Sequence, residues 1–151
     1  MHNKLAVVTT GLLGVLALSV GLAQSIVKPE VTESPIYVAL NSQDWQPCEG
    51  LPGCGFVSLF GDPAVEGSQT IFRLEAGTEF PKHWHTSSEN YMGVQGRLNF
   101  NLETGETATL ARGDFLYYQG GMVHWGQCAE GEDCVYYVYN NLPYDIVLVE
   151  E

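Results

Sequence analysis

Four side chains of the types that bind transition metals lie in two short stretches of the sequence. His83 and His85 are two residues apart, Glu89 follows four residues later, and His124 stands further along the chain. Alternate residues of a β-strand face the same side, so the imidazoles of His83 and His85 would point in one direction. A turn over residues 86–88 would bring the Glu89 carboxylate to that side. Two imidazoles and a carboxylate predict a site for a first-row transition metal, with His124 as the candidate fourth ligand.

These histidines could instead be ordinary core or surface residues, because a single histidine more often has that role than the role of a metal ligand. The coincidence of positions favours a site: apart from His2, every histidine of the chain belongs to this group. His124 is also flanked by the apolar Val123 and Trp125, which favours an enclosed imidazole. A buried neutral imidazole needs a partner, and a metal ion is one way to supply it.

The elements that must position these side chains are predicted to be β-strands. No long stretch after residue 23 has helical periodicity, whereas short β-type runs alternate with turns that contain Gly, Pro or Asp. One strand is predicted around His83 and His85, and a short one is predicted to begin at His124. The other predicted strands are residues 36–41, 55–60, 69–75, 89–94, 97–102, 107–110, 114–118, 134–139 and 146–149. This pattern predicts one all-β domain, an antiparallel sandwich or small barrel.

The first stretch resembles the first sequence motif of the cupin superfamily. The order Gly77-x₅-His83-x-His85-x₃-Glu89-x₆-Gly96 matches every fixed position of that motif. The spacing is specific, and chance agreement over five fixed positions is improbable.

The second cupin motif, Gly-x₅-Pro-x-Gly-x₂-His-x₃-Asn, is matched in part. Gly113, Gly121 and His124 stand at their expected positions, whereas Gln119 replaces the Pro and Cys128 replaces the Asn. Neither departure affects a metal ligand of the family. The loss of Pro puts the geometry of the loop in question, because proline fixes the backbone there.

The resemblance covers residues 70–128 strongly and implies a single-domain cupin-type β-barrel, that is, a jelly roll or double-stranded β-helix. It implies that His83, His85, Glu89 and His124 bind one Fe, Mn, Ni, Cu or Zn ion inside one mouth of the barrel. Residues 81–86 also resemble a subgroup of small cupins, some of which are exported. The family includes many homodimers, so the resemblance also allows a homodimer here.

These implications give three function hypotheses. The leading one is a metal-dependent enzyme, a dioxygenase-type oxidoreductase that acts on a small organic molecule. In a variant of this hypothesis Glu89 leaves the metal and acts as a catalytic base. The alternatives are a non-enzymatic module that binds a metal or a small molecule, and a metal-dependent isomerase or hydrolase.

Strand parity with the ligands gives candidates for the lining of a substrate pocket. The candidates are Arg73, Tyr91, Met122, Tyr137 and Tyr139. Tyrosine is also common in the core and on the surface of ordinary β-proteins, so aromatic content alone does not indicate a pocket.

Residues 1–23 are predicted to be a signal peptide. Lys4 gives a positive start, residues 5–22 are mainly apolar, and Gly21 and Ala23 fit a cut after Ala23, with a cut after Ser25 as the weaker option. An uncleaved anchor is the rival interpretation, but the Thr and Gly content makes a poor bilayer span. We therefore expect a periplasmic or secreted protein with no stable membrane anchor after cleavage. Residues 24–35 would form an extended lead-in to the cupin domain at 36–151.

The four cysteines, Cys48, Cys54, Cys128 and Cys134, form two pairs with the same spacing. An even number in an exported chain predicts disulfides. Three connectivities are open, and two local pairs are favoured because each would close a loop. Four reduced thiols or a metal site are the alternatives, although the spacing is not that of zinc ligands.

The charge of the chain argues against nucleic acid as a partner. Lys and Arg number 6 against 18 Asp and Glu, which gives a formal net charge of −12. Such a surface repels phosphate backbones. The expected partner is therefore a small-molecule ligand or substrate.

Overall fold

The computed structural model describes residue 30 and residues 34–40 and 45–150. The chain divides into two units, residues 1–34 and 35–151, and nearly all of the described residues belong to the second. The predicted signal peptide and most of the predicted lead-in lie outside the described residues. The domain boundaries proposed from the sequence therefore stay predictions.

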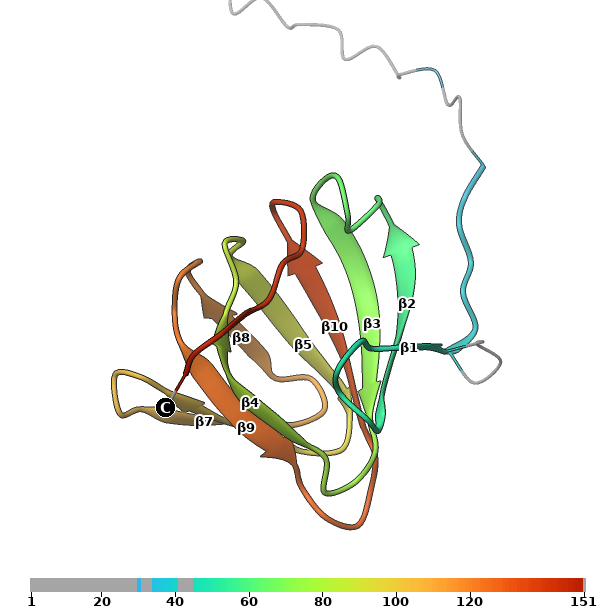
Figure 1. Cartoon of the computed structure of the whole chain (residues 1–151). Helices are drawn as coiled ribbons and strands as arrows, with labels where there is room; N and C mark the ends of the chain where they lie inside the picture. The colour runs from blue at the N-terminus through green and yellow to red at the C-terminus, as the bar shows by residue number, and fades with distance from the viewer. Residues whose placement is uncertain (1–29, 31–33, 41–44, 151) are drawn as a thin grey trace, which may run out of the picture. The chain divides into compact units, whose positions relative to one another are not determined.

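Two antiparallel sheets form the second unit and face one another (Figure 1). The six-stranded sheet has the order β1-β2-β3-β10-β5-β8, and the five-stranded sheet has the order β11-β4-β9-β6-β7. The strands of the first sheet are β1 (Gln46–Pro47), β2 (Cys54–Phe60), β3 (Ser68–Leu74), β5 (Glu89–Gln95), β8 (Phe115–Tyr118) and β10 (Cys134–Asn140). Those of the second are β4 (Glu79–Trp84), β6 (Leu98–Leu102), β7 (Thr107–Leu110), β9 (His124–Cys128) and β11 (Val147–Leu148).

The chain crosses repeatedly from one sheet to the other, and this crossing brings the two sequence motifs together. β3, β5, β8 and β10 belong to the six-stranded sheet, whereas β4, β6, β9 and β11, each of which follows one crossing, belong to the five-stranded sheet. The core between the sheets includes Leu74, Leu98, Phe100, Leu110 and Val138, each at most 3% exposed. The predicted all-β fold class is confirmed. The described part of the chain contains no α-helix, and so no helix long and apolar enough to cross a membrane.

One predicted strand is wrong in the part that the structure describes. Residues 36–39 form no strand, and Leu40 lies in a short 3₁₀ turn. The run is apolar, but Ile36 is 65% and Tyr37 is 90% exposed. A strand needs a hydrogen-bonded partner as well as suitable residue types, and none of the described strands pairs with this run.

The two disulfides are the local pairs favoured by the sequence, Cys48–Cys54 and Cys128–Cys134. The first closes the loop that leads into β2. The second joins the end of β9 to the start of β10, and both of its cysteines are fully buried. Two disulfides are compatible with an oxidising compartment.

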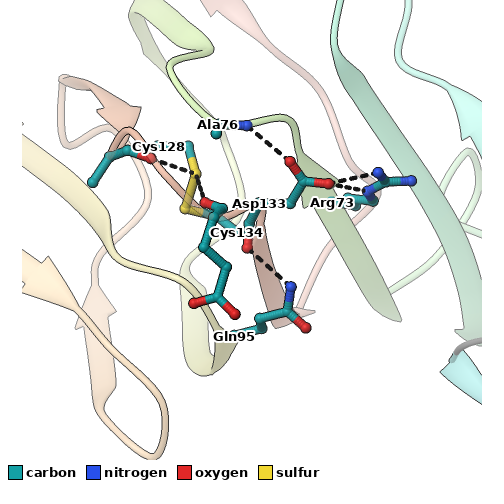
Figure 2. Close-up of a disulfide and its surroundings, with 8 residues drawn as sticks. Arg73, Ala76, Gln95, Cys128, Asp133 and Cys134 are labelled. Atoms are coloured by element: carbon teal, nitrogen blue, oxygen red, sulfur yellow. Dashed lines mark hydrogen bonds and ion pairs between the residues drawn. A yellow bond between two sulfur atoms is a disulfide. The ribbon is translucent and has the colours of Figure 1, made fainter.

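Asp133 ties the loop of the second disulfide to the end of β3 (Figure 2). Its Oδ2 accepts hydrogen bonds from Arg73 Nε at 3.0 Å and Arg73 Nη2 at 2.5 Å, and its Oδ1 accepts one from the Ala76 amide at 3.0 Å. The hydrogen bonds from Arg73 lower the pKa of Asp133 below its usual 3.8. The ionised carboxylate is therefore the form that the folded protein prefers.

Replacing Asp133 with asparagine is expected to destabilise the fold by about 1 kcal/mol near neutral pH, because Arg73 loses its anionic partner. A carboxylate whose pKa is lowered on folding contributes stability above its unfolded pKa, and this contribution is lost as the pH falls through the folded value. The difference between wild type and Asp133→Asn should therefore shrink in acid, which urea unfolding at several pH values would show. Glu132→Gln, at the exposed neighbouring residue, is the control; a pH-independent difference would contradict the assignment.

Candidate metal centre

The ends of three strands bring His83, His85, Glu89 and His124 together. His83 lies in β4 directly opposite His124, the first residue of β9, and His85 follows the end of β4. Glu89 is the first residue of β5 and comes from the other sheet. All four side chains are at most 5% exposed. The residues singled out by sequence spacing therefore form one buried group.

The three imidazoles share one hydrogen-bonding arrangement. The Nδ1 atom of each ring lies against a backbone carbonyl oxygen, which can only accept, so Nδ1 carries the proton and donates. The Nε2 atom of each ring is then left with a free lone pair. The acceptors are Pro81 for His83 at 2.7 Å, Met122 for His124 at 3.0 Å, and Asp145 for His85. One ring nitrogen of each histidine lies within 4.8 Å of those of the other two.

The state of His124 shows that this group fits a metal ion. Its Nε2 atom is buried and has no hydrogen-bond partner among the described residues, which costs about 1–3 kcal/mol in a folded protein. Burial lowers the pKa of His124 to about 3 and also lowers the pKa values of His83 and His85. The rings are therefore neutral, which is the form that binds metals, and a metal would provide the missing partner.

Glu89 lies beside the histidines and is held by other side chains. Its Oε2 is 3.4 Å from His85 Nε2 and 3.8 Å from His124 Nε2. Burial raises the pKa of Glu89 to about 7, against the opposing effect of its hydrogen bonds. Tyr91 donates to Oε2 at 2.9 Å, and Asn140 donates to Oε1 at 3.3 Å. Near neutral pH this carboxyl group is therefore able both to hold and to release a proton.

The loop before His124 is fixed by hydrogen bonds, although Gln119 stands where the second cupin motif has Pro. The Gly120 amide donates to Ser88 Oγ at 3.1 Å, and the Gly121 amide donates to the His85 carbonyl at 2.8 Å. Gly121 has a φ of 89°, which other residues rarely adopt. These bonds join the two motifs directly, so the loop is fixed by contacts with the ligand-bearing segment.

A cavity of about 440 Å³ extends from the histidines toward the surface. Its walls are mainly apolar and include seven Phe and Tyr rings. The hydroxyl groups of Tyr136 and Tyr144 have no hydrogen bond to another described residue. Phe72 stacks on Tyr136 at 5.6 Å between ring centroids, and the Tyr144 ring lies 4.9 Å from that of His85. The loop of the Cys48–Cys54 disulfide and residues 144–146 complete the lining. The described lining contains no Lys or Arg.

The expected lining of the pocket differs from the cavity of the structure. Of the five candidates only Tyr91 lines it. Arg73 is paired with Asp133, and Met122 packs against the core. On β10 the residues that face inward are Tyr136 and Val138, so Tyr137 and Tyr139 have the opposite parity. These four side chains therefore do not line this cavity.

Four residues that matter to the site's geometry were not singled out from the sequence: Tyr136, Asn140, Tyr144 and Asp145. Tyr136 is missed because the opposite side of β10 was expected to face the site, and Asn140 lies just beyond the strand predicted over residues 134–139. Asp145 accepts hydrogen bonds from the amide and hydroxyl of Thr86, at 2.8 and 2.6 Å. Asp145 lies 60 residues after His85 and 59 after Thr86, and no local pattern around it indicates this contact.

Two facing antiparallel sheets with a histidine cluster between them define a protein of the cupin type. The sequence profile of the ChrR cupin-like domain matches residues 33–142, and the chain belongs to this family. A curated relative, the DNA damage-repair/toleration protein DRT102 of Arabidopsis thaliana, is 27% identical over 124 residues. The match covers 81% of this chain but only 38% of that protein.

Solved structures show the same fold at low sequence identity. The polyketide cyclase RemF of Streptomyces resistomycificus is 18% identical, with a TM-score of 0.66 over 78% of this chain and 87% of that one. Salicylate 1,2-dioxygenase of Pseudoaminobacter salicylatoxidans, solved as a mutant in complex with gentisate, is 19% identical, with a TM-score of 0.57 over 70% of this chain and 32% of that one. These similarities confirm the cupin fold predicted from the sequence.

Proposed function

We propose that this chain is an exported, metal-dependent cupin enzyme whose ligands are His83, His85, His124 and Glu89. The observation that carries the proposal is the convergence of three Nε2 atoms, each in a ring oriented by a carbonyl at Nδ1, on a cavity large enough for a small organic molecule. One divalent Fe, Mn, Ni, Cu or Zn ion would fill this set. A bound ion of this kind acts as a Lewis acid and, if redox-active, allows reaction with O₂.

The walls of the cavity favour an uncharged, flat ligand. Aromatic rings contact apolar and aromatic ligands well, and without Lys or Arg in the described lining an anionic ligand has no cationic side chain to meet. The hydroxyl groups of Tyr136 and Tyr144 supply donors that orient a ligand oxygen. We therefore propose small aromatic molecules that carry hydroxyl or carbonyl groups as the substrate class, and dioxygenase-type oxidation as the reaction.

Glu89 is the residue best placed to move a proton. Its carboxyl group receives the hydrogen bond of Tyr91, whose hydroxyl accepts one from Tyr118 at 2.8 Å. Burial raises the pKa values of both tyrosines far above 10, so both stay protonated donors. Proton transfer by Glu89 requires its carboxylate to be free of the metal at that step, so the two roles exclude each other at any one moment.

A second candidate function is a non-enzymatic module that binds a metal or a small molecule. The family match favours it, because the family is described by the ChrR domain, and ChrR was solved as an anti-sigma protein in complex with Rhodobacter sphaeroides SigE. A metal-dependent isomerase or hydrolase is the third candidate. Export by residues 1–23, cut after Ala23, belongs to the same proposal and is supported by the two disulfides.

Metal analysis followed by nitric oxide binding separates these functions. Protein purified without added metal is expected to hold about one transition-metal ion per chain. The protein loaded with Fe(II) without oxygen should bind nitric oxide, a probe for an open O₂ position, and give the electron paramagnetic resonance signal of an iron nitrosyl. Neutral phenol should alter that signal more than anionic benzoate does.

Three results would contradict parts of the proposal. Failure to hold or take up any metal would exclude both enzyme hypotheses. Metal binding without a nitrosyl signal would exclude the dioxygenase and leave the hydrolase, isomerase and binding module. An equal response to phenol and benzoate would exclude the proposed ligand class.

A further inference from the structure

The outer side of the five-stranded sheet carries a groove that is separate from the cavity. The groove has a volume of about 590 Å³ and crosses β4, β9 and β6, which are neighbours in that sheet. We call the polar and tryptophan side chains of its lining the groove residues: Glu79, Lys82, Asn99, Asn101, Trp125 and Gln127. None of them lines the cavity. Lys82 and Trp125 are each adjacent in sequence to a histidine of the metal centre, so their side chains point to the opposite side of the sheet.

The register of the three strands arranges these side chains in two rows. The first row consists of Glu79, Gln127 and Asn99, which are directly opposed. In the second row Trp125 lies opposite Asn101, and the Lys82 Nζ atom lies 4.8 Å from the centroid of the Trp125 ring. Strands lie about 4.8 Å apart, and side chains on one side repeat about every 6.6 Å, so the rows cover roughly 10 Å by 7 Å.

The three amide side chains of the groove have free hydrogen-bonding groups. Asn99 Oδ1 accepts a hydrogen bond from Thr109 Oγ1 at 2.9 Å, which leaves the amide nitrogen of Asn99 as a donor. The side chains of Asn101 and Gln127 have no hydrogen bond to another residue that the structure describes. An amide offers both donors and an acceptor, as a hydroxyl group does. The groove is therefore suited to a ligand with several hydroxyl groups.

Trp125 adds an aromatic surface beside these amides. Tryptophan is usually highly buried, whereas Trp125 is only half-buried and lies in the groove. The faces of a sugar ring consist of C–H groups, which pack on an aromatic ring, while the hydroxyl groups at the rim of the sugar reach neighbouring polar side chains. The contact of Lys82 with Trp125 is a weak one at an exposed site, so a ligand can displace the ammonium group or accept a hydrogen bond from it.

The charges of the groove favour a neutral ligand. Its lining contains one Lys and one Glu, whose formal charges cancel, in a chain of formal charge −12. Neither Glu79 nor Lys82 forms an ion pair within the described part of the chain. The carboxylate is free to accept hydrogen bonds from hydroxyl groups, and the ammonium group is free to donate them.

We infer that the groove binds a neutral saccharide, with one sugar ring packed on Trp125 and its hydroxyl groups paired with the amides of the neighbouring strands. The aromatic surface and the amides together carry the inference, because each matches a different part of the same sugar ring. It is independent of the proposed function, since the groove residues neither belong to the metal centre nor line the cavity.

Isothermal titration of the full chain with oligosaccharides tests the inference. The neutral probes are cellohexaose, maltohexaose and mannohexaose, and an oligogalacturonate is the anionic probe. At least one neutral probe should bind. Trp125→Ala should weaken that binding about 10-fold, as loss of an aromatic contact does, and Asn101→Ala should weaken it several-fold. Tyr117→Ala removes an exposed aromatic side chain from the other sheet and should bind the probe as wild type does.

Three results would overturn the inference. They are wild-type protein that binds none of the neutral probes, binding of the oligogalacturonate alone, and binding that both Trp125→Ala and Asn101→Ala leave unchanged. Circular dichroism shows whether each variant folds. Because Trp125 is adjacent to His124, Asn101→Ala provides the test if Trp125→Ala is unfolded.

Discussion

Replacing His124 with alanine is expected to lower the affinity of the proposed metal site for a transition-metal ion at least about 100-fold. Loss of a residue that only orients a ligand costs 10- to 100-fold in metal proteins, and loss of a ligand itself costs at least as much. The substitution also removes the buried Nε2 atom that has no hydrogen-bond partner among the described residues. The measurement is titration of the metal-free protein with Zn²⁺ or Mn²⁺, with elemental analysis of the purified variant.

A change in packing has to be separated from the loss of a ligand atom. Phe100→Leu is the matched control, because the Phe100 ring lies 6.4 Å from the His124 ring and supplies no metal ligand. This variant should lose stability but keep its affinity for the metal within a few fold. If His124→Ala bound metal as wild type does, the assignment of His124 as a ligand would be wrong.

Glu89→Gln is expected to remove the loss of stability with rising pH that Glu89 gives to the metal-free protein. Burial raises the pKa of Glu89 from 4.5 to about 7. A carboxyl group with a raised pKa favours folding when it is protonated, so its contribution is complete below its unfolded pKa and is lost as the pH rises through the folded value. Between pH 4.5 and about pH 7, the free energy of unfolding of the wild type should fall by about 3 kcal/mol relative to that of Glu89→Gln, which cannot ionise at this position.

Urea unfolding of both proteins, with metal removed by a chelator, measures this difference at several pH values. Comparing the two proteins largely cancels the opposite effect of the three histidines, whose lowered pKa values make them destabilising as the pH falls below 6.5. Glu79→Gln at an exposed carboxyl group controls for overall charge. Added Zn²⁺ should then stabilise wild type more than Glu89→Gln above neutral pH. A constant difference across pH would show that Glu89 titrates normally.

The positions of the proposed ligands were predictable because their spacing is local. His83 and His85 obey the two-residue period of a strand, and Glu89 follows after one short turn. Most strands were also predictable, since turns with Gly and Pro separate them clearly. The parity of β10 was not, because Tyr136 and Val138 on one side are as apolar as Tyr137 and Tyr139 on the other. The usual alternation of apolar and polar residues disappears when both sides of a strand are apolar.

The contact of Asp145 with the first motif could not be predicted, because it is a long-range contact. Asp145 is polar, lies in an irregular segment, and reaches the first motif through a backbone carbonyl as well as through its side chain. A backbone atom carries no sequence signal, since every residue has one. Residues 36–40 show the complementary error, because their strand-like composition did not make them a strand of either described sheet.

Asp145 contributes both to the histidine group and to the wall of the cavity. Its backbone carbonyl oxygen accepts a hydrogen bond from His85 Nδ1 and so orients that ring. Asp145 also lines the cavity. A molecule large enough to displace this wall would also remove the acceptor at Nδ1 and reduce the basicity of Nε2. Binding in the cavity and binding of an ion at the proposed metal site would therefore be thermodynamically linked. By reciprocity a bound ion would hold the wall in place and restrict the size of the molecules that enter.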